Sequence, residues 1–292
     1  MQILVAGKSG QLARALARLA PAGMHIAFHG RDTMDLAVSG TAAGLIAETR
    51  PDLVINAAAW TAVDLAETER TAAWRLNAEA PGEIAQACTE AGAALVHVST
   101  DYVYDGTKAG PYVETDPVAP INVYGAGKLA GEQAVLTANP RSVVLRTSWV
   151  YSPWAKNFVL TMLGLADRPR LRVVDDQRGT PTSALDLADA CLAIAPRLAG
   201  SGAGDPVWGI YHYAGRGACS WADLAAETFA LTGPPAPEIE RILTTEYPTP
   251  ARRPANSVLD CKKFETTFGC VTVPWRCALA RVVAMHFKGS DG

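Results

Sequence analysis

Short apolar runs alternate with longer segments of helical periodicity over the first two thirds of the chain. Each run is nearly continuous in apolar residues, which is typical of strands that are buried on both faces. The segments between the runs carry apolar residues three and four positions apart, the spacing of one helix face. The predicted strands cover residues 2–6, 25–28, 53–58, 94–99 and 143–147, and the predicted helices cover residues 11–19, 41–49, 72–91 and 123–138.

After about Tyr151 this rhythm loosens. Prolines become frequent between residues 234 and 254, and within this stretch residues 233–237 and 247–250 are predicted to be loops or turns. Patterns of the form Ser-x-x-Asp, in which a serine can cap a helix, predict two helix starts. The two additional strands are expected at residues 171–174 and 210–213, and the two helix starts at Ser183 and Ser220.

The regular alternation of strands and helices predicts a parallel sheet with helices on both of its faces. The expected fold class is therefore α/β, with a Rossmann-type doubly wound parallel sheet and a smaller C-terminal substrate-binding lobe. We predict an NAD(P)-binding Rossmann domain over residues 1–150, with a return segment at about 171–205. Residues 151–170 and 206–292 are expected to form the lobe, over the carboxyl edge of the sheet where such folds bind ligands.

Composition narrows the class of protein. Hydrophobic residues make up 49% of the 292 residues, charged residues 19%, and the net charge is −3, which is typical of a soluble globular protein. The chain has no basic stripe for nucleic acid and no apolar run of membrane-spanning length, and its first residues read as a buried strand. The six cysteines are scattered and the five histidines lack metal-ligand spacing, so we expect a cytoplasmic protein without a metal site.

A glycine-rich turn follows the first predicted strand and opens the first helix. Gly7 and Gly10 lie in a G-x-x-G-x-x-A pattern that ends at Ala13. Such a turn lets the backbone approach a pyrophosphate, which the free N–H groups and the dipole of the helix then stabilise. An ordinary strand–turn–helix corner is the alternative, but the position at the start of the chain favours a dinucleotide site.

The end of the second predicted strand bears on the choice between NADPH and NADH. A carboxylate at this place usually binds the ribose hydroxyl of NAD, but Arg31 precedes the first carboxylate, Asp32. A guanidinium suits the additional phosphate of NADP. We therefore expect NADPH to be used at least as well as NADH. A solvent-exposed loop arginine is the alternative interpretation.

Tyr124 and Lys128 are four residues apart in a predicted helix, so they share one face. A free tyrosine has a pKa near ~10, and a nearby ammonium favours the phenolate. Thr100 ends an upstream buried strand and can meet them at one point of the fold. Together the three groups predict a catalytic site that gives a proton to a carbonyl oxygen or takes one from an alcohol. A solvated helix face is the alternative for the pair alone.

Seven motifs occur in an order that is similar to that of one family. The chain resembles the dTDP-4-dehydrorhamnose reductases, extended short-chain dehydrogenases/reductases of L-rhamnose biosynthesis, from Met1 to about Phe287. The STD and Y-x-x-x-K motifs are shared across the superfamily, whereas RTSWVY and YPTPxxRPxNS are more characteristic of this family. The motifs are GKSGQL, NAAAWTAVDLAE, VHVSTDYVYDG, NVYGAGKLAGE, RTSWVY, DDQRGTPT and YPTPARRPANS.

The resemblance implies reduction of the C4 ketone of a dTDP-sugar by NADPH or NADH. It makes Tyr124 the proton donor, Lys128 the group that holds the nicotinamide ribose and lowers the pKa of the tyrosine, and Thr100 a hydrogen-bond donor to the carbonyl. The remaining implied contacts are Gly7, Gly10, Gln11 and Leu12 at the pyrophosphate, Asp35 and Leu36 at the adenine, Ala59 and Thr61 at the ribose and phosphates, Trp149 at the sugar, and Asn157 and Arg253 (or its neighbour Arg252) at the nucleotide of the substrate.

Two departures from the family pattern concern the cofactor and the assembly. His29 stands where the family often has an acidic residue, and the first helix lacks the carboxylates that bridge some dimers through magnesium. We predict no metal site, and either a monomer or a homodimer. Two other functions stay open: another nucleotide-sugar 4-ketoreductase or epimerase, and a non-catalytic NADP-binding subunit similar to the regulatory subunit of methionine adenosyltransferase.

Overall fold

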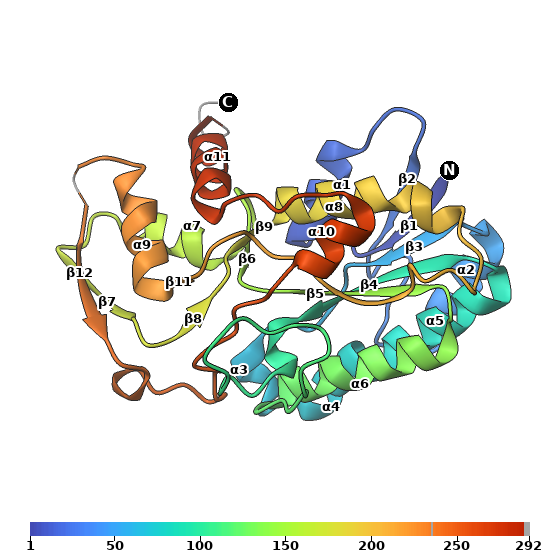
Figure 1. The fold of residues 1–292 in the computed structure, drawn as a ribbon, viewed down its shortest axis with the longest axis horizontal. Coiled ribbons are helices and arrows are strands. Elements are labelled where there is room, and N and C mark those ends of the chain that lie inside the picture. The colour runs from blue at the N-terminus through green and yellow to red at the C-terminus, as the bar shows by residue number, and fades with distance from the viewer. Residues whose placement is uncertain (235, 289–292) are drawn as a thin grey trace.

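A six-stranded parallel sheet forms the centre of the computed structural model, which describes residues 1–234 and 236–288 (Figure 1). All neighbouring strands in this sheet run parallel, in the order β10-β5-β4-β3-β1-β2. The predicted α/β class with a doubly wound sheet is confirmed. The strands are β1 (Gln2–Ala6), β2 (His25–His29), β3 (Leu53–Asn56), β4 (Ala94–Thr100), β5 (Ser142–Thr147) and β10 (Gly209–His212).

Helices cover both faces of the sheet because successive side chains of each strand point to opposite sides. In β1, Ile3 and Val5 pack in the core under α1 (Gln11–Leu19) and α8 (Ala184–Ala199). Leu4 and Ala6 pack in the second core, on the opposite face. The helices of that face are α2 (Thr41–Thr49), α5 (Ala80–Ala91) and α6 (Val123–Ala138).

The predicted helix at 72–91 consists of three parts. Helix α4 (Arg70–Trp74) runs into a π-helical segment, η1 (Arg75–Glu79), and then into α5. The π-helical segment buries Asn77, whose amide accepts a hydrogen bond from Trp60 N at 2.9 Å and donates one to Trp60 O at 3.0 Å. The widened turn thereby fixes the loop that follows β3, at the carboxyl edge of the sheet.

A second, smaller core lies beside the sheet. It is built on α7 (Phe158–Leu163), α9 (Trp221–Ala230) and a separate parallel ribbon of β7 (Arg170–Val174) and β12 (Glu238–Ile242) (Figure 1). Strand β12 lies between the two predicted loops of the proline-rich stretch, at 233–237 and 247–250, and was not predicted. Of the predicted loop at 233–237, residue 235 lies outside the described residues.

The strand pairing differs from the predicted domain limits in two places. Strand β7 was expected in the return segment to the Rossmann domain, but it pairs with β12. Strand β10 was expected in the lobe, but it pairs with β5 and extends the central sheet. Within the return segment, α8 packs on the sheet domain, against α1, β3 and β4.

Short elements complete the described part of the chain. Ser183 and Ser220 both cap helices as predicted, and Ser220 forms the full reciprocal capping box with Asp223. No helix among the described residues is long and apolar enough to cross a membrane. The remaining elements are α3 (Val63–Ala66), β6 (Val150–Tyr151), β8 (Arg178–Gly179), β9 (Thr182–Ser183), β11 (Cys219–Ser220), α10 (Lys262–Phe268), α11 (Trp275–Lys288) and the 3₁₀ turns η2 (Asp101–Val103) and η3 (Thr244–Glu246).

Candidate active site

A cavity of about 430 Å³ opens at the carboxyl edge of the central sheet. This is the edge at which open α/β sheets bind their ligands. Of the predicted cofactor and catalytic residues, eight line the cavity and four do not. Those that line it are Gly10, Gln11, Leu12, Arg31, Ala59, Thr61, Tyr124 and Lys128, and those that do not are Gly7, Asp35, Leu36 and Thr100.

The glycine turn has the backbone that its sequence predicts. Gly7 has a φ of +120°, which disfavours any side chain, and its N–H donates to His29 O at 2.8 Å. Gly10 caps α1 with extended backbone and no side-chain bond, and a Cβ added there would meet no atom within 4 Å. The open space above Gly10 exposes the first N–H groups of α1 to the cavity, which suits an anion.

The residues after β2 divide between the cavity and the core. Arg31 is exposed at the cavity, and no hydrogen bond or ion pair involves it among the described residues. Leu36 is buried in the core beneath α2, and Asp35 accepts a hydrogen bond from Ala37 N at 3.0 Å. The two residues expected at the adenine therefore do not line the cavity, because the loop turns into the core after Thr33.

Tyr124 is brought to the cavity by the start of α6. The Asn122 side chain caps this helix by accepting a hydrogen bond from Gly125 N at 2.7 Å. Gly125 packs directly on the η2 turn: an added Cβ would lie 2.2 Å from Tyr102 O. This close approach sets Tyr124 beside Thr100, whose hydroxyl opposes the rise in the pKa of the phenol.

Lys128 lies one turn farther along α6 and is almost fully buried, at 1% exposure. Its Nζ donates to Val98 O at 2.7 Å and lies 3.5 Å from His97 Nε2. Burial lowers the pKa of Lys128 to about 8, and the buried carboxylate of Glu132 opposes this shift. The ammonium is thus fixed at the floor of the cavity and protonated at neutral pH.

The pKa of Tyr124 differs from the expectation that Lys128 lowers it. Burial of the ring raises the pKa to about 12, the nearby Thr100 hydroxyl lowers it, and the charge of Asp101 raises it. Burial outweighs the other two effects because a phenolate loses its hydration in the closed site. The tyrosine is therefore a neutral proton donor at physiological pH.

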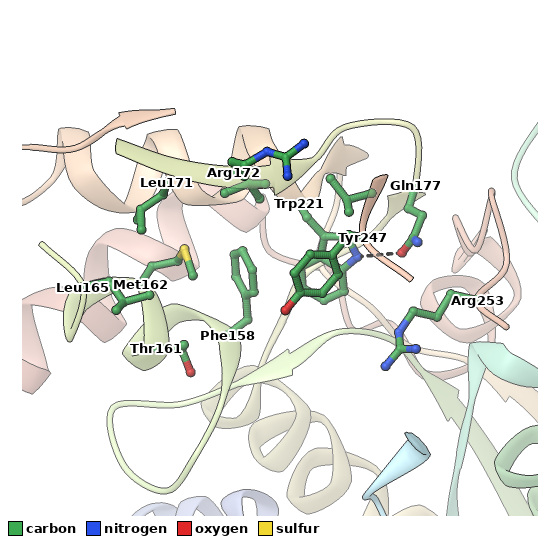
Figure 2. A pocket seen from close by; sticks show the side chains of 12 residues that line it. Phe158, Thr161, Met162, Leu165, Leu171, Arg172, Gln177, Trp221, Tyr247 and Arg253 are labelled. Carbon is green, nitrogen blue, oxygen red and sulfur yellow. Dashed lines mark hydrogen bonds between the residues drawn. The ribbon is translucent and has the colours of Figure 1, made fainter. Parts of the chain in front are cut away.

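A second cavity of about 380 Å³ lies in the smaller core (Figure 2). Its apolar part comes from α7, β7 and α9, through Phe158, Met162, Leu171 and Trp221. Tyr247 reaches over the middle of the cavity, and Arg253 lies at one end of it (Figure 2). Neither Trp221 nor Tyr247 was predicted as a site residue, although Tyr247 opens the YPTPARRPANS motif.

Three residues expected at the substrate are held by the protein itself. Trp149 stacks on Trp221 with ring centroids 3.5 Å apart, and it covers Gly179, where an added Cβ would lie 2.3 Å from the indole. Asn157 caps α7 by accepting from Leu160 N at 3.0 Å. Arg253 forms a two-point ion pair with Asp64 of α3, with N–O distances of 2.9 and 2.7 Å. Arg253 lines the second cavity, whereas the neighbouring Arg252 is exposed and does not.

Comparison with known proteins identifies the family. The family model described as the RmlD substrate binding domain matches residues 1–287. A dTDP-4-dehydrorhamnose reductase of Sinorhizobium fredii is 45% identical over the whole of both chains, and one of Escherichia coli K12 is 43% identical over 97% of each.

The chain belongs to the dTDP-4-dehydrorhamnose reductase family.

Solved structures of dTDP-4-dehydrorhamnose reductases agree with this assignment, which confirms the resemblance found in the sequence. The enzyme of Clostridium acetobutylicum superposes with a TM-score of 0.91 at 36% identity, covering 98% of this chain and 99% of its own. The enzyme of Bacillus anthracis, solved in complex with NADP, gives a TM-score of 0.90 at 32% identity, covering 97% and 99%.

The dTDP-4-dehydrorhamnose reductase assignment also bears on the predicted alternatives. A UDP-glucose 4-epimerase of Thermus thermophilus superposes with a TM-score of 0.81, but at 21% identity this likeness shows the fold alone.

Within residues 1–234 and 236–288, no group of three or more histidine, cysteine, aspartate or glutamate side chains is arranged to hold a metal ion.

Proposed function

We propose that this protein reduces the C4 ketone of dTDP-4-dehydro-β-L-rhamnose to dTDP-β-L-rhamnose with NADPH. The observation that carries the proposal is the meeting of Tyr124, Lys128 and Thr100 beside the first cavity, in a member of the reductase family. A non-catalytic regulatory subunit does not need these three groups to lie together in one site. Their arrangement therefore favours an enzyme.

The first cavity fits a nicotinamide dinucleotide. Its open glycine turn at the start of α1 suits a pyrophosphate, and Arg31 is free to pair with a phosphate on the adenosine ribose. Thr147 also lines the cavity, and its buried hydroxyl has no hydrogen-bond partner among the described residues. A bound cofactor would supply the hydride, and Lys128 would hold its ribose hydroxyls. The NADP complex of the Bacillus anthracis relative supports this choice of cofactor.

Tyr124 and Thr100 complete the reduction, by donating a proton and a hydrogen bond respectively. Tyr124 gives its phenolic proton to the C4 oxygen as negative charge develops there, which is general acid catalysis. Thr100 donates a hydrogen bond at the same place and stabilises that charge. Lys128 is buried and Tyr124 half-buried on the same helix, α6, and Thr100 is buried at the end of β4, so little reorganisation is needed at the moment of reaction.

The second cavity is the proposed site of the substrate's nucleotide. Its apolar wall and the ring of Tyr247 suit a flat base, and Arg253 at its end suits a diphosphate. Trp149, which stacks on Trp221 of this cavity's wall, is proposed to pack on the sugar. Asn157 is proposed to act through its cap, by holding the start of α7 in place.

The cysteines bear on the cellular compartment. None of the six cysteines is in a disulfide, which is the usual state in a reducing compartment, and we infer a cytoplasmic protein from this. A monomer and a homodimer both remain compatible with the proposed chemistry, since every proposed site residue comes from one chain.

The direct test is NADPH oxidation with dTDP-4-dehydro-L-rhamnose, generated by the upstream dehydratase and epimerase. We expect stoichiometric NADPH consumption, with NMR showing dTDP-L-rhamnose as the product. A product that differs at another sugar carbon would indicate the alternative ketoreductase or epimerase. Tight NADP binding without NADPH oxidation would instead support the regulatory-subunit alternative.

Arg31→Ala should reduce the preference for NADPH over NADH. Loss of one charge-assisted hydrogen bond to phosphate costs about 1.5–3 kcal/mol, which is roughly tenfold or more in KM for NADPH. The KM for NADH should change little, because NADH lacks that phosphate. Arg18→Ala, at an exposed position in the last turn of α1, is the matched control. A wild-type enzyme that strongly prefers NADH would contradict the role given to Arg31.

A further inference from the structure

Asp64 is an ion-pair partner to which the reaction described above gives no role. It lies in α3, shortly after Thr61 of the first cavity, and its carboxylate binds Arg253, which lines the second cavity. The two partners are 189 positions apart and belong to two of the motifs in the sequence, NAAAWTAVDLAE and YPTPARRPANS. The fold therefore joins a motif of the cofactor cavity to a motif of the second cavity through one ion pair.

The hydrogen bonds of Arg253 leave one edge of its guanidinium free. Nη1 donates to Asp64 Oδ1 at 2.9 Å and Nη2 donates to Asp64 Oδ2 at 2.7 Å, so the carboxylate occupies the edge between the two terminal nitrogens. Nη1 also donates to Thr249 Oγ1 at 2.6 Å and to Ala251 O at 2.9 Å. A guanidinium has five N–H groups in one plane. The Nε–H and the second Nη2–H, which share the other edge, have no acceptor among the described residues.

This free edge suits a phosphate. Two parallel N–H groups of a guanidinium match two oxygens of one phosphate group. Arg253 lies at the end of the second cavity, where a ligand can reach it (Figure 2). Because the carboxylate of Asp64 binds through two oxygens, it fixes both the plane and the rotation of the guanidinium. The free edge is therefore held in one orientation before any ligand arrives.

The backbone that carries Arg253 is held at two further points. Ala251 N donates to Asp64 Oδ1 at 3.1 Å, so the same carboxylate binds the segment and its side chain. The side chain of Asn122, which caps α6, donates to Arg252 O at 2.8 Å. Helix α6 carries Tyr124. The segment is therefore fixed relative to α3 and to the helix that provides the proton donor.

We propose that Asp64 is a positioning residue for the substrate, which holds Arg253 so that the free edge of the guanidinium binds the diphosphate of the dTDP-sugar. The inference deepens the proposed function and rests on it. Asp64 itself does not touch the substrate. It sets where the diphosphate lies relative to the cofactor cavity, and so helps to bring the sugar ketone to Tyr124.

The carboxylate has two opposing effects on a bound diphosphate. Hydrogen bonds from Arg253 hold the pKa of Asp64 below its usual value, against the effect of burial, so Asp64 is charged at neutral pH and repels an anion. Its side chain is 41% exposed, and water and salt therefore screen this repulsion. The orienting effect is not screened, since ordering one long side chain upon binding costs about two- to tenfold in affinity. We therefore expect the loss of Asp64 to weaken diphosphate binding.

The test compares the binding of dTDP with that of thymidine, which has the same base but no phosphate. Asp64→Asn keeps the size of the side chain and removes its charge. Its Kd for dTDP, measured by calorimetry, should rise about two- to tenfold. Its Kd for thymidine and its Kd for NADPH should stay unchanged. With the ketosugar, KM should rise by a similar factor while kcat changes little.

Arg253→Lys is the second variant, which keeps the positive charge but removes the two edges. A lysine ammonium lacks the planar fork that can bind a carboxylate on one edge and a phosphate on the other. This variant should weaken dTDP binding at least as much as Asp64→Asn does. Adding Asp64→Asn to it should change the Kd for dTDP little, because the carboxylate then has no guanidinium to orient.

Asp205→Asn is the matched control. Asp205 also accepts from a guanidinium, that of Arg197 at 3.0 Å, and from a backbone N–H, that of Val207 at 3.0 Å. It lines neither cavity. In thermal melts the control should lose about as much stability as Asp64→Asn, but all of its binding constants should equal those of the wild type.

Two results would overturn the role of Asp64. One is an Asp64→Asn protein that binds dTDP as tightly as the wild type or more tightly. The other is an equal loss of affinity for thymidine and dTDP, which would indicate a general distortion of the cavity. Because these titrations need no ketosugar, a wild-type protein that binds dTDP in this way but does not oxidise NADPH with the ketosugar would refute the proposed reaction alone.

Discussion

Tyr124→Phe should lower kcat by ~10²–10⁴-fold, the contribution that a positioned proton donor typically makes. The phenyl ring keeps the packing contacts of the tyrosine but removes the hydroxyl whose proton passes to the C4 oxygen. The Kd for NADPH should stay nearly unchanged, because the proposed cofactor contacts come from Lys128, Arg31 and the glycine turn. Steady-state kinetics and a fluorescence titration with NADPH measure the two quantities.

Tyr211→Phe is a matched control for this substitution. Tyr211 is also buried and donates one hydrogen bond, to Val207 O at 2.9 Å, but it lies in β10, away from the cavity. The control should lose about 0.5–1.5 kcal/mol of stability and keep its kcat. A Tyr124→Phe enzyme that retains most of its activity would refute the assignment of the proton donor.

Lys128→Met should weaken both cofactor binding and catalysis. Methionine matches the length of lysine, but it removes a buried charge and leaves Val98 O without its donor. The loss of a charge-assisted hydrogen bond costs about 1.5–3 kcal/mol, so the Kd for NADPH should rise about 10–100-fold. The kcat should fall as well, because the same ammonium stabilises the negative charge that passes to Tyr124.

The pH dependence offers a second measurement on Lys128. Since burial lowers its pKa to about 8, the wild-type ammonium loses its proton as pH rises through that value, and NADPH binding should weaken there. The methionine variant should bind NADPH equally poorly on both sides of pH 8.

Lys263→Met is the matched control for the lysine. Lys263 also donates to a backbone carbonyl, Ile210 O at 2.7 Å, but from an exposed position. Its substitution should leave the Kd and its pH dependence unchanged. If Lys128→Met instead binds NADPH as tightly as the wild type, the lysine does not hold the cofactor.

Local patterns predicted the sheet domain well because each of its strands and helices has its own periodic signal. The limits of β1, α1, α2 and α6 agree with the prediction. The π-helical segment at Arg75–Glu79 was not predicted, because one residue inserted in a helix leaves the apolar pattern on both sides intact. The pairing of β7 with β12 was not predicted either, since the sequence of a strand does not indicate which other strand it pairs with.

The candidate site was predicted where a motif fixes the backbone. Gly10 of the glycine turn lines the cavity, and so do Tyr124 and Lys128 of the Tyr-x-x-x-Lys helix. Asp35 and Leu36 were expected at the adenine from the family resemblance, without a motif of their own, and Leu36 lies in the core instead. Asp64 was not recognised, because the role of a carboxylate depends on burial and on partners that only the folded chain reveals.

The separate β7–β12 ribbon has a consequence for how the protein is made. Strands β1 to β5 all lie before residue 148, so most of the central sheet can pair while the rest of the chain is still being synthesised. The ribbon joins residues 68 positions apart, such as Arg170 and Glu238, and must wait for the late strand. The half of the molecule proposed to bind the cofactor is thus expected to be folded on the ribosome before the wall of the sugar-nucleotide cavity exists.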